Sequence, residues 1–211
     1  MKIFIVANEQ QEKELGLINA AKKNSFVIQK QLPATDEYKD YDAFFILKDF
    51  SALSNFDIFE NKPVIINEVT ETLTDLKLPD NFHRINAWPG FLQRRIWEVA
   101  SNEPEKIKSL FDAFEKKAFF VKDEPGFVSA RVISMIINEA FFALDEKIST
   151  KDEIDLAMKT GTNYPYGPFE WAEKIGVGNI LKLLKKLSEK EERYLPAPGL
   201  ESFSDQQNKN D

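Results

Sequence analysis

The stretch DEPGFVSARVISMIINEAFFALDE, residues 123–146, decides the architecture of the second part of this chain. Pro125 lies where a helix can begin. The N–H groups of a first helical turn have no partner within the helix, so the missing N–H of proline costs no hydrogen bond there. Beyond it the apolar residues recur at the spacing of one helical face. This stripe consists of Ile133, Ile136, Ile137, Ala140 and Leu144. The pattern predicts a long amphipathic helix that packs its apolar face against other helices.

A second helix is expected over residues 151–160. Thr150 or Ser149 caps its start, and Glu153 lies three residues beyond Thr150, which is the spacing of a capping box. Gly161 is expected to end the helix, because glycine adopts the left-handed conformation that follows a last helical turn.

Two more helices complete the predicted helical part. Pro168 lies in the first turn of one of them, after a glycine, and residues 179–189 form the other. The sequence therefore predicts an all-helical domain over residues 122–200. The polar residues 201–211 are expected to be a flexible tail.

Residues 1–121 favour a small parallel α/β sheet, because short β-branched or aromatic runs alternate with helical segments. Residues 86–97 fit neither period and contain a Pro89-Gly90 turn. The predicted strands are residues 2–7, 25–29, 42–47 and 63–67, with a last one at 119–122; the predicted helices are residues 10–23, 52–60 and 104–117.

The composition excludes several kinds of function. The net charge is −7, which disfavours nucleic acid as a partner. The absence of cysteine excludes disulfides, cysteine zinc sites and thiol nucleophiles, and a single histidine makes a metal site an unfavoured expectation. No window approaches the apolar length of a membrane span, and the first residues lack the features of a signal peptide. We expect a cytoplasmic protein with no membrane partner.

Three motifs in order resemble the C-terminal domain of the 3-hydroxyacyl-CoA dehydrogenase family. One is the Asp-x-Pro-Gly-Phe turn at residues 123–127, followed by Asn138-Glu139-Ala140 on the long helix. The next is EIDLAMKTGTNYPYGPFEWAEKIGVGNI at residues 153–180, and the last is RYLPAPGL at residues 193–200. Most of these residues also have a structural interpretation as caps, turns and core.

The resemblance implies a fold, a partner and a reaction. The fold is α/β plus all-α: a small, truncated Rossmann-like parallel sheet at residues 1–121 and an all-helical dimerisation domain at residues 122–200. The implied partners are an acyl-CoA-like small molecule and a second copy of the chain, joined through the helical domain. The implied reaction is the oxidation of short 3-hydroxyacyl-CoA thioesters in fatty acid metabolism, with NAD as the cofactor.

The family's catalytic pattern is a histidine, an asparagine three residues later and then a glutamate. His83, Asn86 and Glu98 are the candidates here, although the interval from His83 to Glu98 is about three residues longer than in the family. In this role the histidine takes the hydroxyl proton and the glutamate orients it. The alternative is that His83 is a surface residue.

Other family positions are changed. An asparagine that helps to hold the substrate oxygen is replaced by Ala130, and Ser129 beside it points elsewhere on a helix. Residues 67–70 resemble the family's Asn-Thr-Ser segment, in which Val69 replaces the serine that contacts substrate. Losing one preorganised donor to developing charge costs roughly 3 kcal/mol, or about 10²-fold in rate.

The cofactor site departs furthest from the pattern. A dinucleotide-binding fold needs glycines after the first strand, so that the pyrophosphate can approach the helix N-terminus. Here the strand runs into ANEQQE at residues 7–12, with Glu9 and Glu12 in the phosphate position, and the second strand leads into QKQ at residues 29–31, without the acid that binds the ribose. We expect NAD not to bind in the usual way, unless Arg84, Arg94 or Arg95 anchors its phosphates. The alternative for the Arg94-Arg95 pair is a solvated helix or strand end.

The sequence thus leaves three hypotheses. The first is an active oxidoreductase that uses His83 and Glu98. The second is a non-catalytic relative, either a dimeric protein that binds acyl-CoA or another small ligand, or an interaction module. The third is an enzyme of different chemistry that uses the same cleft without a nicotinamide.

Overall fold

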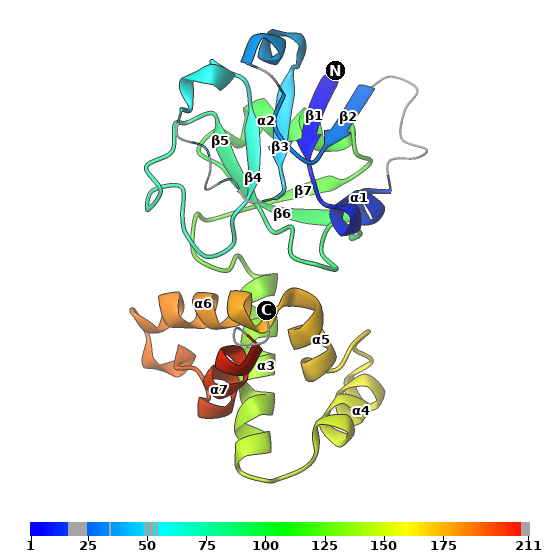
Figure 1. Ribbon diagram of the computed structural model, residues 1–211, viewed down its shortest axis with the longest axis vertical. Coiled ribbons are helices and arrows are strands. Elements are labelled where there is room, and N and C mark those ends of the chain that lie inside the picture. The colour runs from blue at the N-terminus through cyan, green and yellow to red at the C-terminus, as the bar shows by residue number, and fades with distance from the viewer. Residues whose placement is uncertain (17–24, 34, 49, 51–52, 54, 208–211) are drawn as a thin grey trace. The chain divides into compact units, whose positions relative to one another are not determined.

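The computed structural model describes residues 1–16, 25–33, 35–48, 50, 53 and 55–207, and it divides the chain into two compact units. The first unit is Met1–Phe127 and the second is Val128–Asp211 (Figure 1). The division falls six residues after the boundary expected at 121/122, because the segment between β7 and Phe127 belongs to the first unit.

The first unit is built on a seven-stranded sheet in the order β2-β1-β3-β4-β5-β6-β7. All neighbouring strands run parallel except β5 and β6, which pair antiparallel. The expected parallel α/β sheet is confirmed. Its strands are β1 (Lys2–Val6), β2 (Ser25–Gln29), β3 (Ala43–Ile46), β4 (Val64–Asn67), β5 (Phe82–Ile85), β6 (Ile96–Ala100) and β7 (Lys117–Val121).

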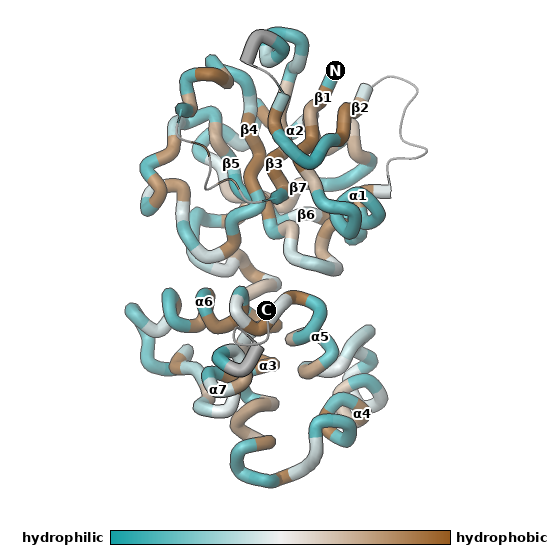
Figure 2. Tube along the Cα trace, in the orientation of Figure 1, coloured by the Kyte–Doolittle hydropathy of each residue, from teal (hydrophilic) through white to brown (hydrophobic). Residues whose placement is uncertain are grey.

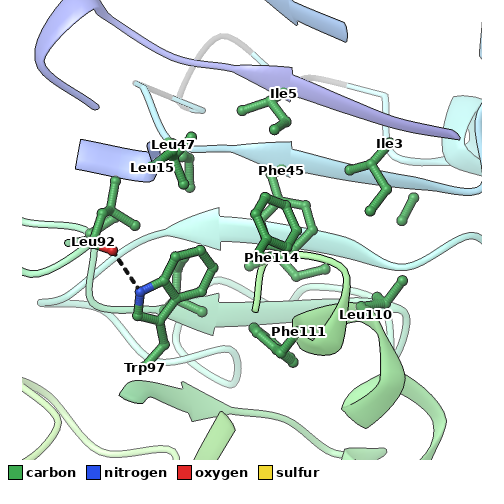
Figure 3. Packing of buried hydrophobic residues seen from close by; sticks show 14 of the residues in the cluster. Ile3, Ile5, Leu15, Phe45, Leu47, Leu92, Trp97, Leu110, Phe111 and Phe114 are labelled. Carbon is green, nitrogen blue, oxygen red and sulfur yellow. Dashed lines mark hydrogen bonds between the residues drawn. The ribbon is translucent and has the colours of Figure 1, made fainter. Parts of the chain in front are cut away.

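The two faces of this sheet bury separate apolar clusters. All four residues of β3 are buried, as expected for a strand covered on both sides, and Figure 2 shows β1, β3 and β4 as hydrophobic strands. On one side of the sheet, alternate residues of the strands face helix α2 (Pro104–Asp112). There, Leu110 and Phe111 of α2 pack with Phe45, Trp97 and Phe114 (Figure 3). The opposite face gathers Phe4, Phe44, Phe59 and Phe82.

Several local predictions for this unit were wrong. Helix α1 is only Glu9–Leu15, because Gly16 takes φ +62° and ends it; the rest of the predicted helix, residues 17–24, lies outside the described residues. Of the predicted helix 52–60, the described residues form only a 3-10 turn, η3 (Asp57–Phe59). A second 3-10 segment is η2 (Thr35–Asp40). Strands β5 and β6 were not predicted, because residues 82–97 mix charged and apolar side chains.

The second unit is all-helical, as expected. The capping box of Thr150 and Glu153 is present, but Gly161 lies inside α4, which ends at Asn163 with φ +56°. Residues 201–207, expected to be flexible, belong to the last helix. The elements are α3 (Ser129–Asp145), α4 (Lys151–Thr162), α5 (Pro168–Ile175), α6 (Val177–Ser188), the 3-10 turn η4 (Glu192–Tyr194) and α7 (Pro198–Gln207).

Candidate functional site

The register between β5 and β6 decides which of the predicted site residues can meet. Arg84 pairs with Ala100 and Ile85 with Val99. Directly opposed residues share a face of the sheet, and successive residues along a strand alternate between faces. Glu98 therefore lies on the face of Arg84, whereas His83 lies on the opposite face. The structure does not bring His83 and Glu98 together.

His83 is a buried structural side chain. It is only 1% exposed, so the surface alternative is wrong, and its Nδ1 lies 2.9 Å from the Ser101 hydroxyl. Since the Ser101 oxygen already accepts the Glu103 N–H at 2.9 Å, the hydroxyl proton is free to point at Nδ1. Burial lowers the pKa of His83 to about 4, against a smaller raising effect of Glu103. At neutral pH the imidazole is uncharged and a weak base.

Asn86 is the residue that the register brings to Glu98. It follows directly on β5, and continuing the pairing by one residue places it opposite Glu98. Asn86 is 3% exposed, and its side-chain oxygen accepts the Trp88 N–H at 3.2 Å. The interval from Asn86 to Glu98 is three residues shorter than the interval from His83 to Glu98. Asn86, and not His83, therefore lies at about the family's distance in sequence from the glutamate. The position facing the carboxylate thus holds an amide, which does not take up a proton near neutral pH.

The three arginines lie in different surroundings. Arg84 is fully buried, and its guanidinium is bonded to Asp123 and to the carbonyls of Glu68 and Glu124. Arg94 lies over the ring of Phe91, at 4.0 Å from its centre. Arg94 and Arg95 are exposed in the turn before β6.

The first helix is capped by its own neighbouring side chains. The Asn8 side chain accepts the Gln11 N–H at 2.9 Å, and the Gln11 side chain accepts the Asn8 N–H at 3.0 Å. Glu9 begins the helix and pairs with Lys30 at 3.1 Å, and the bond from Lys30 lowers the pKa of Glu9. The carboxylate therefore stays ionised beside the helix start. Two N–H groups at the helix start, those of Asn8 and Gln11, are therefore already bonded, and an ionised carboxylate lies beside the helix end that would attract a phosphate.

Protein side chains also link the carboxyl ends of the central strands. In the strand order of this sheet, β1 lies between β2 and β3, and the crevice between β1 and β3 is the usual ligand site of such a fold. Gln11 donates to the Leu47 carbonyl at 2.6 Å, directly after β3. Asn67 donates to the same carbonyl at 3.1 Å and accepts the Ala87 N–H at 3.0 Å. These bonds tie α1, β3, β4 and the end of β5 to one another.

Sequence reasoning missed this linkage, although one signal for it was present. An asparagine followed three residues later by glutamine just after a strand is a capping-box spacing. The hydrogen bond from Gln11 to the Leu47 carbonyl depends on tertiary packing, and no local sequence pattern predicts it.

The other two changed positions are apolar and buried in the structure. Ala130 is fully buried in the first turn of α3, and Ser129 beside it is half-buried. Val69 is 3% exposed, and its carbonyl accepts the Gly126 N–H at 2.7 Å. Both side chains lack a polar group, so neither can hold a substrate oxygen.

The motifs of the second unit stabilise the fold of that unit. The Asn138 side chain donates to the Leu195 carbonyl at 2.9 Å and accepts the Ala197 N–H at 2.7 Å, which fixes the closing segment to α3. Asp155 accepts the N–H groups of Phe169 and Glu170 at 2.8 and 3.2 Å, and thereby caps α5. The structural interpretation of these motif residues is thus supported by their bonds.

The described residues contain neither a metal-binding cluster nor a membrane-spanning helix. No group of three or more histidine, aspartate or glutamate side chains there could hold a metal ion. Within the same part of the chain, no helix has both the length and the apolar character needed to cross a bilayer.

Comparison with known proteins identifies the second unit. The family model of the 3-hydroxyacyl-CoA dehydrogenase C-terminal domain matches residues 126–210. The chain is 43% identical over 83 residues to 3-hydroxyadipyl-CoA dehydrogenase of Escherichia coli, which covers 38% of this chain and 18% of that protein. It is 35% identical over 99 residues to a probable 3-hydroxybutyryl-CoA dehydrogenase of Bacillus subtilis, covering 46% of this chain and 34% of the relative. In both cases the match spans about a third or less of the relative's length.

Solved structures extend the likeness of fold to the first unit. An (S)-3-hydroxybutyryl-CoA dehydrogenase from Ralstonia eutropha superposes with a TM-score of 0.67 at 21% identity, over 95% of this chain and 92% of the other. A 3-hydroxybutyryl-CoA dehydrogenase from Escherichia coli superposes with a TM-score of 0.60 at 29% identity, over 70% of this chain and 32% of the other. The sheet and the helices together therefore have the fold of these enzymes.

Proposed function

We propose that this chain, whose residues 126–210 form a 3-hydroxyacyl-CoA dehydrogenase C-terminal domain, is a non-catalytic relative that binds an acyl-CoA-type ligand without transferring hydride. The ligand class rests on the names of two relatives, a 3-hydroxyadipyl-CoA dehydrogenase and a probable 3-hydroxybutyryl-CoA dehydrogenase. The absence of hydride chemistry rests on the side chains of the first unit.

The observation that carries the proposal is the identity of the residue opposite Glu98. Oxidation of an alcohol requires a base to accept the hydroxyl proton, and Asn86 does not provide one. His83 does not replace it, because it lies on the other face of the sheet and burial lowers its pKa to about 4. Loss of a general base costs about 10²- to 10⁴-fold in rate.

The side chains at the cofactor position support the same proposal, because they do not fit NAD. The Asn8–Gln11 box engages two N–H groups at the helix start, where a pyrophosphate would bind, and ionised Glu9 repels a pyrophosphate there. Gln11 and Asn67 both bond the carbonyl after β3, at the crevice where a dinucleotide lies in such folds. Arg84 is engaged with Asp123 and two carbonyls, so it does not offer an alternative anchor.

We expect no acetoacetyl-CoA-dependent NADH oxidation by the wild-type protein above the rate without protein. The same result is expected for His83→Gln and Glu98→Gln, because neither residue performs proton transfer. The assay is absorbance at the NADH band, with a known 3-hydroxybutyryl-CoA dehydrogenase as the positive control. Oxidation that is lost in His83→Gln would restore the hypothesis of an active enzyme with His83 as its base. Isothermal titration with acetoacetyl-CoA tests the ligand class separately.

The proposal includes a homodimer formed through the second unit. Large apolar side chains of this unit that are more than half exposed are the candidates for burial against another copy. They are Val128 at 53%, Val132 at 51%, Ile148 at 69%, Leu156 at 58% and Leu195 at 55%. We also propose that the protein works in the cytoplasm. Disulfides are rare in that compartment, and a chain without cysteine forms none.

Multi-angle light scattering tests the dimer. The wild type should elute with twice the mass of the chain, and the double variant Val132→Lys/Leu156→Lys should elute as a monomer, because charges disrupt an apolar interface. Lys182→Glu is the control, since it changes charge at an exposed position of a different helix, α6. A monomeric wild type at all concentrations would contradict the dimer, without bearing on the absence of hydride transfer.

A further inference from the structure

Arg84 forms a clamp on the segment that leads out of the first unit. Its guanidinium donates to the Asp123 carboxylate at 2.9 Å, to the Glu124 carbonyl at 3.2 Å and to the Glu68 carbonyl at 3.2 Å. It also lies over the ring of Phe127, at 4.8 Å from its centre. A guanidinium suits this role because it presents several donors in a fixed plane.

The clamp is buried, so its bonds are protected from water. The Arg84 side chain is 0% exposed and that of Asp123 is 19% exposed. Burial lowers the pKa of Arg84, while the carboxylates of Asp123, Glu68, Asp75 and Glu71 oppose that shift. A buried arginine keeps its charge, and removing either partner leaves an uncompensated buried group.

Two neighbouring bonds hold the same segment on the first unit. The Gly126 N–H donates to the Val69 carbonyl at 2.7 Å, and the Thr74 N–H donates to the Asp123 carboxylate at 3.4 Å. Together with Arg84, they attach residues 123–126 to β5 and to the loop that follows β4. The segment is thus bonded at both ends and in its middle.

The backbone conformation changes at the end of this segment. Gly126 has φ +82° and Phe127 has φ +49°, a left-handed value that a bulky side chain adopts only when its surroundings require it. Phe127 is 4% exposed and lies under Arg84. Val128 already belongs to the next element, since its carbonyl accepts the Val132 N–H at 3.1 Å in the manner of a first helical turn of α3.

We propose that Arg84 locks residues 123–127 onto the first unit, so that the pivot for any movement between the two units is the junction of Phe127 and Val128. Arg84 is then a positioning residue: it determines where the chain can bend. The proposal does not depend on the function proposed above, because it concerns only bonds within the first unit.

Amide hydrogen exchange on the full chain tests the clamp. In Arg84→Met, which keeps an apolar stem over Phe127 but has no donors, the amides of residues 123, 124, 126 and 127 should exchange roughly 10- to 100-fold faster, the range expected for losing charge-assisted hydrogen bonds. Trypsin cleavage after exposed Lys122 should accelerate in parallel. Arg94→Met is the matched control, because Arg94 also lies over a phenylalanine ring but outside the segment.

Equal exchange of residues 123–127 in Arg84→Met and Arg94→Met would overturn the proposal. If Arg84→Met does not fold, ¹⁵N relaxation of the wild type decides instead. Order parameters of residues 123–127 as high as those of β5 support the lock, with a drop beginning at Val128. Order parameters that already fall at Asp123 overturn it.

Discussion

Acidification from pH 7 to pH 4 should lower the free energy of unfolding by on the order of 3 kcal/mol through His83 alone. In the folded chain burial lowers the pKa of His83 to about 4, whereas an unfolded histidine keeps a value near 6.5. Between these two values the unfolded state binds more protons, so stability rises with pH and is lost as the pH falls through this window. The loss is a large part of the 5–15 kcal/mol typical of folded domains.

Urea unfolding of the wild type and of His83→Gln at pH 7, 5.5 and 4.5 measures this effect. Glutamine can accept the Ser101 hydroxyl but does not titrate, so the difference between the two proteins should shrink or reverse as the pH falls. Because His83 is the only histidine, its ring protons give one titration curve by NMR. A folded-state midpoint near 6.5 would show that the imidazole is solvated and would contradict the prediction.

Gly167→Ala should destabilise the second unit by about 2–4 kcal/mol, the sum of a lost cap and local overpacking. A Cβ on Gly167 would lie 2.3 Å from the Asp155 carboxylate, which is closer than real Cβ contacts allow. Asp155 is buried and holds the Phe169 and Glu170 N–H groups, so moving it removes the cap of α5. The φ of Gly167 is −72°, so the clash and not the backbone conformation is the cause.

Gly161→Ala is the control for this substitution, and it should have the opposite sign. Gly161 lies inside α4, and a Cβ there would meet nothing within 4 Å. Alanine in a helix interior is favoured over glycine by roughly 0.5–1 kcal/mol. Thermal unfolding followed by circular dichroism compares the two variants. If both substitutions change the free energy of unfolding by the same amount and in the same direction, the position of Asp155 does not require a glycine at residue 167.

The helical half was predictable because its signals are local. The apolar stripe of residues 133–144 and the Thr150–Glu153 box act within one or two helical turns, and both were found as expected. The helix over residues 198–207 was missed, because the bond from Gly199 N–H to Asp145 that helps to place its start joins residues far apart in the sequence.

The candidate site could not be derived in the same way. The resemblance to the family's catalytic pattern suggested His83 and Glu98 as partners, but the face on which each side chain lies depends on strand register. A shift of one residue moves a side chain to the other face of the sheet. Neither β5 nor β6 was recognised as a strand, so the pairing of Ile85 with Val99, which places Asn86 beside Glu98, was not accessible.

The clamp at Arg84 shows a related limit. Its partners, Glu68, Asp123 and Glu124, are separated from it by 16 to 40 residues, and no sequence period connects them. From the sequence, Arg84 was a candidate phosphate anchor. It is instead fully buried and paired with Asp123, because the segment that follows β7 lies against the Arg84 side chain of β5.

The most direct test of the central proposal is a fluorescence titration of the full chain with NADH, with and without acetoacetyl-CoA. The proposal predicts no saturable NADH binding in either case, because the Asn8–Gln11 box and Glu9 occupy the phosphate position and Gln11 and Asn67 link the strand ends. Saturable NADH binding at micromolar concentrations, followed by oxidation when acetoacetyl-CoA is added, would contradict it and would establish this chain as an active dehydrogenase.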